Sequence, residues 1–455
     1  MGKFRTMVTI KNELGPPPPV SPVDVDKLRS EILESIKEFP VIDCHDHTMG
    51  PKTAPEYKEP ITALIQGYFQ SDLVSAGGET LMGKLNDQSI PTQEKWPIFE
   101  KLWNRTKHTA YARVTRLVLR NFYGEEEMTL EAVKRVGRKL LKLKDEKVYA
   151  RILNKAQIKC RLVNVNPDLK DFISGKYKMY PLDRLLIPLP GFHSVRSQPG
   201  VEGFARIVDG SVADLDEYLD VCMKIFSKMK DAGAVGFKDQ SAYSRTIRYD
   251  NVPRNEAEKL FNFMMEDPRR SLGWPEAKPL DDYLFHAFMK MAGKLGLPVQ
   301  IHTGHMAGWR NDIVKTNAAN FTSVLELHRK VNFDLFHGNW PYLGELLYLA
   351  KNFPNVAIDC CWVNIIDPFY TEQLMANSIV TVPHSKIHGF GADYGDCVEY
   401  AASHLEIARD VIAGALARSV SRGWLERADV EKVAADWLFN NPNEFFRLEF
   451  KPFEP

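Results

Sequence analysis

The stretch VIDCHDHTMG, residues 41–50, directly follows a proline near the start of the chain. Val41 and Ile42 predict a buried strand, and the residues after the second histidine predict the exit of that strand into a loop. Because alternate residues of a strand point to the same side, His45 and His47 would project their rings together, in a geometry that can chelate a metal ion. The alternative is that two histidines share one strand by chance, and other residues of the chain are needed to choose between these two interpretations.

Composition narrows the class of protein before any single residue is given a role. The 455 residues carry a formal net charge of zero and no block of like charge, which removes the electrostatic argument for binding nucleic acid or an anionic membrane. We therefore expect a small-molecule substrate. No apolar run reaches the length of a membrane span, and the N-terminus lacks the apolar core of a signal peptide. The six cysteines show no CxxC spacing, which favours a reducing, cytoplasmic compartment and disfavours a cysteine metal site.

Short apolar runs alternate with amphipathic helical patterns over most of the chain. With residues 41–47 they number eight, and the other seven are CRLVNVN (160–166), RLLIPLPGF (184–192), AVGFKD (234–239), PVQIHTGH (298–305), FDLFHGN (333–339), VAIDCCW (356–362) and IHGFGADY (387–394). The helical segment 281–296 shows an apolar stripe made of Leu284, Phe288, Met291 and Leu295. Eight parallel strands that alternate with helices predict an α/β fold, the (β/α)8 or TIM barrel, with its active site at the C-terminal ends of the strands.

Two segments fall outside the alternating pattern. Residues 48–157 have little strand character but repeated helical signals, so they predict a helical insertion after the first strand. Because the insertion leaves that strand at its catalytic end, we expect it to cap the barrel mouth. Residues 1–39 form an N-terminal extension, in which Pro16–Pro19 predict a stiff, extended lead-in. The barrel domain would run over residues 40–455, with a helical tail over 401–448. We also expect a homo-oligomer.

Potential metal ligands stand at the C-terminal ends of several predicted strands. His45 and His47 end the first strand, His302 the fifth, His337 the sixth and Asp393 the eighth. Histidine and carboxylate ligands around an open position suit a catalytic divalent metal, most often zinc, with manganese or iron as alternatives. Chance does not easily place such side chains at the ends of four separate strands. The set therefore favours one metal centre over scattered structural histidines.

Further polar residues near the predicted strand ends are candidates for substrate binding. Lys238, in the fourth strand, fits a substrate-binding cation or a partly buried structural lysine better than a carbamate that bridges two metals. His305 and Trp309 follow the fifth strand and are candidates for the wall of the site. Arg196 and Arg310 are candidate carboxylate clamps, because a guanidinium matches the fork of a carboxylate, or else they are solvated loop residues.

At this point the sequence resembles the amidohydrolase superfamily, in particular its branch of metal-dependent hydrolases, decarboxylases of the aminocarboxymuconate-semialdehyde type and uronate isomerases. The similar stretches are VIDCHDH, GLPVQIHTGH, DLFHGNWPY and HGFGADYG, within residues 40–445. The resemblance implies a set of roles: metal ligands His45, His47 and His302, ligand and proton acceptor Asp393, and polarising group or general acid/base His337. The long insertion is similar to the uronate isomerases, whereas the motifs of strands 5 and 6 are similar to the hydrolases and decarboxylases. The context GFKDQ differs from the lysine context of members with two metals, so one metal is expected.

From the sequence we expect a metal-dependent hydrolase that acts on an amide, ester or lactone of a small carboxylate-bearing or sugar-acid substrate. In this hypothesis the metal activates water and Asp393 takes up the proton. The first alternative is a decarboxylase or a uronate isomerase on the same scaffold, because the fold does not choose among these reactions. A barrel without activity, serving as a binding module, is a remote alternative that the intact set of potential ligands disfavours.

Overall fold

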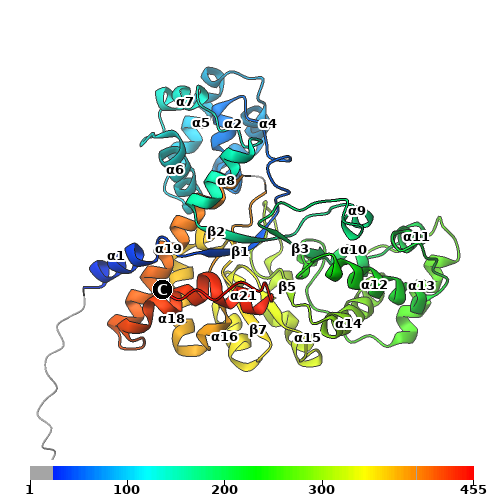
Figure 1. Ribbon diagram of the computed structural model, residues 1–455. Coiled ribbons are helices and arrows are strands. Elements are labelled where there is room, and N and C mark those ends of the chain that lie inside the picture. The colour runs from blue at the N-terminus through cyan, green and yellow to red at the C-terminus, as the bar shows by residue number, and fades with distance from the viewer. Residues whose placement is uncertain (1–23, 396) are drawn as a thin grey trace, which may run out of the picture.

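A barrel of parallel strands forms the centre of the protein (Figure 1). The computed structural model describes residues 24–395 and 397–455, and the predicted proline-rich lead-in lies outside them. Within these residues the eight strands neighbour one another in sequence order, and they are β1 (Val41–Asp46), β2 (Ile158–Val163), β3 (Asp183–Pro188), β4 (Gly236–Asp239), β5 (Val299–Ile301), β6 (Phe333–Leu335), β7 (Val356–Asp359) and β8 (Ile387–His388). The N–H of Cys44 donates to the carbonyl of Phe390 at 3.1 Å, which ties the segment after β8 to β1. The predicted (β/α)8 architecture is confirmed.

Helices cover the outer face of the strands and continue into the C-terminal tail. Outside the insertion they are α1 (Val25–Ile36), α9 (Leu169–Ile173), α10 (Pro190–His193), α11 (Gln198–Ile207), α12 (Leu215–Asp231), α13 (Arg254–Met265), α14 (Lys278–Leu295), α15 (Thr322–Leu327), α16 (Leu343–Asn352), α17 (Val363–Ile366), α18 (Pro368–Thr381), α19 (Val398–Ser421), α20 (Val430–Ala435) and α21 (Asn441–Phe445). Local sequence explains where they begin: at α12, for example, the Asp214 carboxylate accepts from the N–H of Glu217 and caps the helix.

The buried face of α14 is broader than the predicted stripe. Leu284 and Phe288 are fully buried, but Met291 and Leu295 are only partly buried. Met289 joins the core instead. A helix that lies on a sheet buries a wide apolar face, so positions on both sides of a narrow stripe reach the core.

The insertion after β1 is helical, as its pattern predicts. Its helices are α2 (Pro60–Leu64), α3 (Phe69–Leu73), α4 (Met82–Asn86), α5 (Thr92–Thr106), α6 (Ala110–Tyr123), α7 (Leu130–Gly137) and α8 (Glu146–Lys155), and they form a lobe beside the ends of β1 and β2 (Figure 1). Buried side chains of this lobe belong to the same apolar cluster as those of the barrel. The insertion therefore shares one continuous core with the barrel.

The last strand is much shorter than the predicted segment 387–394. Beyond His388 the chain passes close to its neighbours: a Cβ at Gly391 would lie 2.7 Å from the Cβ of Cys361. Only glycine permits this approach, and it fixes the path of the segment that carries Asp393. In the described part of the chain, no helix is long and apolar enough to cross a membrane.

Candidate metal centre at the barrel mouth

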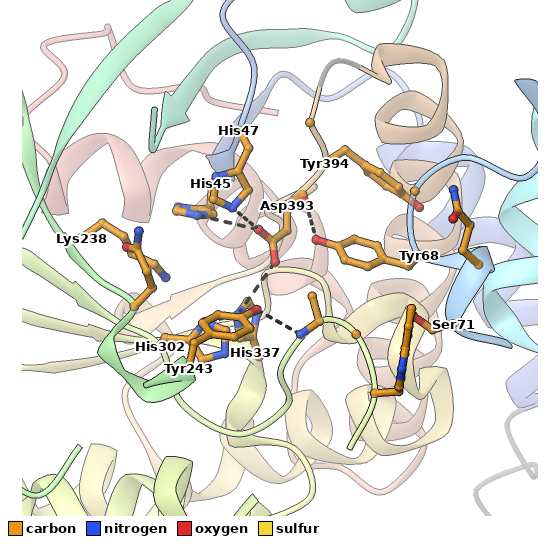
Figure 2. A pocket seen from close by; sticks show the side chains of 17 residues that line it. His45, His47, Tyr68, Ser71, Lys238, Tyr243, His302, His337, Asp393 and Tyr394 are labelled. Atoms are coloured by element: carbon orange, nitrogen blue, oxygen red, sulfur yellow. Dashed lines mark hydrogen bonds and ion pairs between the residues drawn. The ribbon is translucent and has the colours of Figure 1, made fainter. Parts of the chain in front are cut away.

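The C-terminal ends of the strands surround a cavity of about 450 Å³ (Figure 2). It brings together most of the candidate residues found in the sequence, namely His45, His47, Lys238, His302, Trp309, His337 and Asp393. The insertion contributes a second set to the same cavity, namely Gly67, Tyr68, Gln70 and Ser71. The mouth of the barrel is thus lined by the strand ends and by the insertion together.

Two histidines and one carboxylate converge in this cavity. The Nε2 atoms of His45 and His47 lie 3.7 and 3.1 Å from the same oxygen of Asp393, Oδ1. The potential ligand atoms of the three residues all lie within 4.8 Å of one another. The Nδ1 of His47 donates to the carbonyl of Asn164 at 2.9 Å, which leaves Nε2 as the nitrogen that can bind a metal. This donor set fits a divalent metal ion with the cavity as its open side.

The electrostatics of the two histidines differ. Burial, with the nearby charge of Lys238, lowers the pKa of His45 well below its ordinary value, so its ring is neutral. Burial also acts to lower the pKa of His47, but the hydrogen bond and charge of the Asp393 carboxylate outweigh it and raise that pKa. The side chain of His47 is 42% exposed, and it faces the cavity (Figure 2).

The backbone of Asp393 is held in an uncommon conformation. Its φ is 58°, in the left-handed region that few non-glycine residues adopt. Its N–H donates to the carbonyl of His45 at 2.8 Å, and its own carbonyl accepts from the hydroxyl of Tyr68. His337 has a similar φ of 57°. Such strain persists only where surrounding contacts hold it, and here it occurs at two residues of one site.

His302 and His337 face each other beside this carboxylate. The Nε2 of His302 donates to the carbonyl of His305 at 2.8 Å, and the Nδ1 of His337 donates to the carbonyl of Cys361 at 3.0 Å. Burial lowers the pKa of both rings well below the ordinary value, so each has one proton. The remaining nitrogens, Nδ1 of His302 and Nε2 of His337, are 3.3 Å apart and both carry lone pairs. The pair can therefore share a proton or accept from a bound hydroxyl group.

Lys238 contributes a buried cation to the floor of the cavity. Its Nζ lies 3.3 Å from the centroid of the Phe336 ring, and it has no hydrogen-bond partner among the described residues. Burial lowers the pKa of Lys238 to about 8. An ammonium group that is buried without a partner is costly, so it favours a ligand that brings an acceptor or a negative charge.

Three of the candidate residues do not line the cavity. Arg196 forms a two-point ion pair with the buried Asp281, one of whose contacts measures 2.7 Å. Arg310 pairs with Glu79 at 2.8 Å, and its side chain is 75% exposed. The ring of His305 packs against Trp362, with centroids 4.8 Å apart. In this structure both arginines are engaged by carboxylates of the protein itself.

Several residues of the site were not predicted from the sequence. Tyr68 comes from the insertion, while Gln240 and Tyr243 follow β4, and the hydroxyl of Tyr243 accepts from the N–H of Ala307 at 3.0 Å. Cys361 lies near His337 and Asp393 in a further group of potential ligand atoms. Position along the chain offered a signal for two of them, because Gln240 directly follows β4 and Cys361 lies two residues after the end of β7. For Tyr68 the sequence offers no signal, since its place depends on how the insertion folds back.

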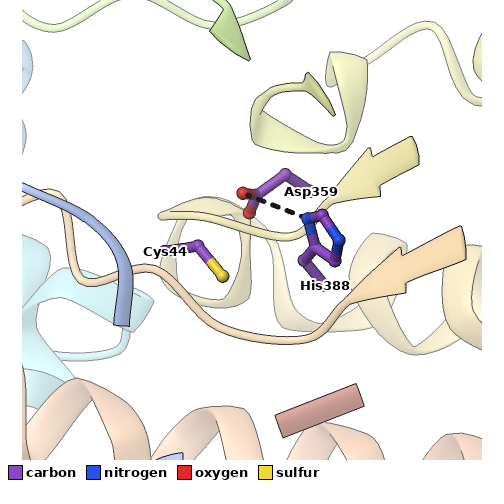
Figure 3. Close-up of side chains that lie close together, drawn as sticks. All are labelled: Cys44, Asp359 and His388. Atoms are coloured by element: carbon purple, nitrogen blue, oxygen red, sulfur yellow. Dashed lines mark ion pairs between the residues drawn. The ribbon is translucent and has the colours of Figure 1, made fainter. Parts of the chain in front are cut away.

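A third group of potential ligands lies deeper in the barrel and is made of Cys44, Asp359 and His388 (Figure 3). All three are fully buried. Burial raises the pKa of Cys44 and of Asp359 well above the ordinary values, which keeps both groups neutral. Neutral thiols and carboxylic acids are poor metal ligands. The mouth site, with the neutral imidazole of His45 and a carboxylate that lines the cavity, is the better metal centre.

The comparisons with known proteins identify the family of the chain. A family model described as Amidohydrolase matches residues 196–448. Among curated proteins, the chain is similar to protein fluG of Emericella nidulans (26% identity over 231 residues, 49% of this chain and 26% of fluG). It is also similar to a uronate isomerase of Caulobacter vibrioides (24% identity over 286 residues, 57% of this chain and 56% of that protein). The chain thus spans about a quarter to just over half of the length of these curated relatives.

Solved structures share the fold over nearly the whole chain. They include a uronate isomerase from Thermotoga maritima (TM-score 0.71, 14% identity, 92% of this chain and 97% of that one). The fold is also similar to that of a glucuronate isomerase from Caulobacter crescentus (TM-score 0.67, 18% identity, 95% of this chain and 96% of that one). A third similar structure is a putative metal-dependent hydrolase from Lactobacillus casei (TM-score 0.63, 17% identity, 92% of this chain and 98% of that one).

The barrel and the set of potential metal ligands at its mouth fit the class of metal-dependent barrel enzymes. Because the family model covers more than half of its residues, the chain belongs to the amidohydrolase family. The resemblance noted in the sequence is confirmed, including its uronate isomerase-like features.

Proposed function

We propose that this protein is a metal-dependent isomerase that interconverts the aldose and ketose forms of a small sugar acid, a uronate. The observation that carries the proposal is the position of the Asp393 carboxylate, with one oxygen toward His45 and His47 and the other toward His337. The uronate isomerases among the relatives and the similar folds support the choice of reaction. This replaces the hydrolase as our first choice.

His45, His47 and Asp393 would hold the metal ion, for which zinc is our first proposal and manganese or iron the alternatives. When bound, the ion would supply a Lewis acid that polarises an oxygen of the substrate. We propose one ion for each chain. His302 remains a proposed further ligand, since its ring lies in the same cavity but outside this set of three.

Acid–base catalysis would be shared between Asp393 and His337. Aldose–ketose isomerisation removes a proton from the carbon beside the carbonyl group, returns a proton to the neighbouring carbon, and moves a proton between the two oxygens. The Oδ2 of Asp393 lies 3.9 Å from the Nε2 of His337. We assign the proton on carbon to Asp393 and the proton on oxygen to His337, which can return it through its contact with His302.

The other lining residues suit a polyhydroxylated acid. Lys238 would bind the carboxylate of the substrate, because it is a buried cation without a partner among the described residues. Gln70, Ser71 and Gln240 offer donors and acceptors for hydroxyl groups, and Trp309 offers an apolar face. The cavity of about 450 Å³ falls within the usual size of small-molecule sites. A small molecule is therefore the proposed partner.

A hydrolase acting on an amide, ester or lactone is the second candidate. The observation that favours it is the fold shared with the putative metal-dependent hydrolase of Lactobacillus casei. In that reaction Asp393 would take up the proton of the attacking water. Decarboxylation uses the same residues, but no similar protein reported above carries that description.

A substrate screen on metal-loaded protein tests the proposal. The parent and a His45→Ala variant are loaded with zinc, manganese or iron, and metal content is measured on the same samples. Proton NMR then follows a panel of hexuronates for conversion to ketoses, and separate assays follow hydrolysis of lactones, esters and amides and release of CO2. Conversion of a hexuronate by the parent alone supports the isomerase. Hydrolysis without isomerisation supports the second candidate. A parent that neither binds nor responds to any metal excludes both.

Assembly and location are further parts of the proposal. We propose a homo-oligomer, and the exposed Phe369 and Trp424, 86% and 66% exposed, mark a surface that could contact a second copy. Light scattering on the purified protein gives the mass directly. We also propose a cytoplasmic location, which the buried thiols of Cys44, Cys160 and Cys222 support.

A further inference from the structure

A buried chain of hydrogen bonds runs from the proposed metal ligand His45 across the interior of the barrel. The Nδ1 of His45 lies 3.1 Å from the side-chain oxygen of Gln300 on β5. The amide nitrogen of Gln300 donates to Asp334 Oδ2 on β6 at 3.1 Å, and Asp334 Oδ1 accepts from the Nδ1 of His388 on β8 at 2.9 Å. His45 is 1% exposed and the other three are 0% exposed, so no bulk water replaces these contacts.

The orientation of the Gln300 amide follows from its partners. Its nitrogen has two hydrogens, and they meet two acceptors, the Asp334 carboxylate at 3.1 Å and the backbone carbonyl of Cys44 at 2.9 Å. The reversed amide would place its oxygen against that carbonyl and lose both bonds. Because a carbonyl cannot donate, the reversed amide would be left with buried, unsatisfied groups. The oxygen of Gln300 must therefore face His45.

This orientation determines where His45 carries its proton. The oxygen of Gln300 can only accept, so the Nδ1 of His45 must be the donor. The lone pair of the neutral ring then lies on Nε2, which points to the cavity and to Asp393 Oδ1 at 3.7 Å. A metal can bind only a nitrogen that carries a lone pair.

We infer that Gln300 and Asp334 are positioning residues, which hold His45 in the tautomer that presents Nε2 to a divalent cation at the barrel mouth. His388 completes the arrangement, because its N–H holds the Asp334 carboxylate in place as an acceptor. His388, which belongs to the deep cluster of potential ligands (Figure 3), thus has a positioning role that does not require it to bind a metal. The inference rests on the proposed function through one point, that His45 binds the metal.

The first test reads the tautomer in the metal-free protein. Nitrogen-15 NMR of protein labelled at histidine distinguishes a protonated from an unprotonated ring nitrogen, and the signals of His45 are assigned by their loss in a His45→Asn variant. We expect Nδ1 to carry the proton in the parent. In Asp334→Asn the Gln300 amide keeps one acceptor, the Cys44 carbonyl, but its other partner can now donate. The amide is then held less strongly, and a minor population of His45 with its proton on Nε2 should appear. A parent with the proton on Nε2 overturns the inference, without need of any other variant.

The second test reads metal affinity by competition with a chelator, using zinc as the probe. Gln300→Leu should weaken zinc binding by about 10- to 100-fold, the usual effect of losing a residue that orients a ligand. Asn355→Leu is the matched control, because the amide of Asn355 is buried and, like that of Gln300, donates to two acceptors, here two backbone carbonyls, but Asn355 lies outside the cavity. Affinity in Gln300→Leu equal to that of the control overturns the inference.

His45→Ala separates failure of this inference from failure of the proposed function. If His45→Ala binds zinc as tightly as the parent, the metal centre itself is wrong. If His45→Ala loses zinc while Gln300→Leu keeps it, the proposed metal centre is supported and only the positioning role of Gln300 is wrong.

Discussion

At the scale of single residues, the site depends on one carboxylate that contacts three histidines. Asp393 faces His45 and His47 through Oδ1, and it faces His337 through Oδ2 at 3.9 Å. Asparagine has the same size and tolerates the left-handed backbone that this position requires. A change to asparagine therefore removes the charge and the basic oxygen while it leaves the fold intact.

We expect Asp393→Asn to lower turnover by several orders of magnitude, because general base catalysis is lost and the metal is held less well. Turnover and metal content should be measured on the same preparations. His337→Asn should lower turnover while metal content stays close to that of the parent. Near-normal turnover in Asp393→Asn would show that another residue accepts the proton.

Tyr68 links the insertion to this carboxylate. Its hydroxyl donates to the backbone carbonyl of Asp393, and its ring stacks on Trp362 with centroids 4.1 Å apart. We predict that Tyr68→Phe lowers turnover about five- to tenfold, the scale of one lost hydrogen bond, and leaves metal content unchanged. Tyr57→Phe is the control, since Tyr57 is a tyrosine of the insertion whose hydroxyl also has a hydrogen-bond partner but which does not line the cavity. Equal turnover in the two variants contradicts a role for the hydroxyl of Tyr68.

At the scale of structural elements, a buried ion pair organises the insertion. The Nζ of Lys95 on α5 donates to Glu59 at 2.8 Å, to the hydroxyl of Thr62 at 2.8 Å and to the carbonyl of Leu85 at 2.9 Å. Glu59 in turn caps α2 by accepting from the N–H of Thr62 at 2.8 Å. The helices α2, α4 and α5 thus meet at one fully paired lysine.

Removal of one partner of the Lys95–Glu59 ion pair should lower the free energy of unfolding more than removal of both. Lys95→Met leaves Glu59 buried without its cation, and we expect it to lower the free energy of unfolding by about 3–5 kcal/mol. The double variant Lys95→Met with Glu59→Gln should recover a large part of that loss, because no unpaired charge remains. Urea denaturation of the parent, both single variants and the double variant gives the coupling. Additive losses would show that the pair is not coupled.

At the scale of the whole molecule, α19 joins the insertion to the barrel and carries a buried acid. Glu399 is 2% exposed, and burial raises its pKa to about 7. Its ordinary value is 4.5, which is the value in the unfolded chain. Between these two pH values the unfolded chain releases the proton while the folded protein keeps it, so rising pH favours unfolding.

We therefore expect the free energy of unfolding to fall as pH rises from about 4.5 to about 7, by as much as about 3 kcal/mol from this residue alone. Glu399→Gln should remove this contribution and make the protein more stable than the parent at pH 8, with little difference at pH 4.5. Glu126→Gln is the control, because Glu126 is exposed. The free energy of unfolding should be measured by denaturation at several pH values. The same pH dependence in the parent and in Glu399→Gln would contradict the prediction.

The sequence by itself determined the barrel, and it predicted where the candidate site would lie. Strand and helix periodicities are local, so residues 41–47 and the seven later runs could be recognised from their neighbours alone, and the strand ends then located His45, His47 and Asp393. The tertiary structure decided which side chains meet. Gln300 lies 255 positions from His45, and Asp281 lies 85 positions from Arg196, which it pairs with and so keeps out of the cavity. Such contacts depend on how distant elements pack and on how burial makes each polar group find a partner, and neither leaves a periodic trace in the sequence.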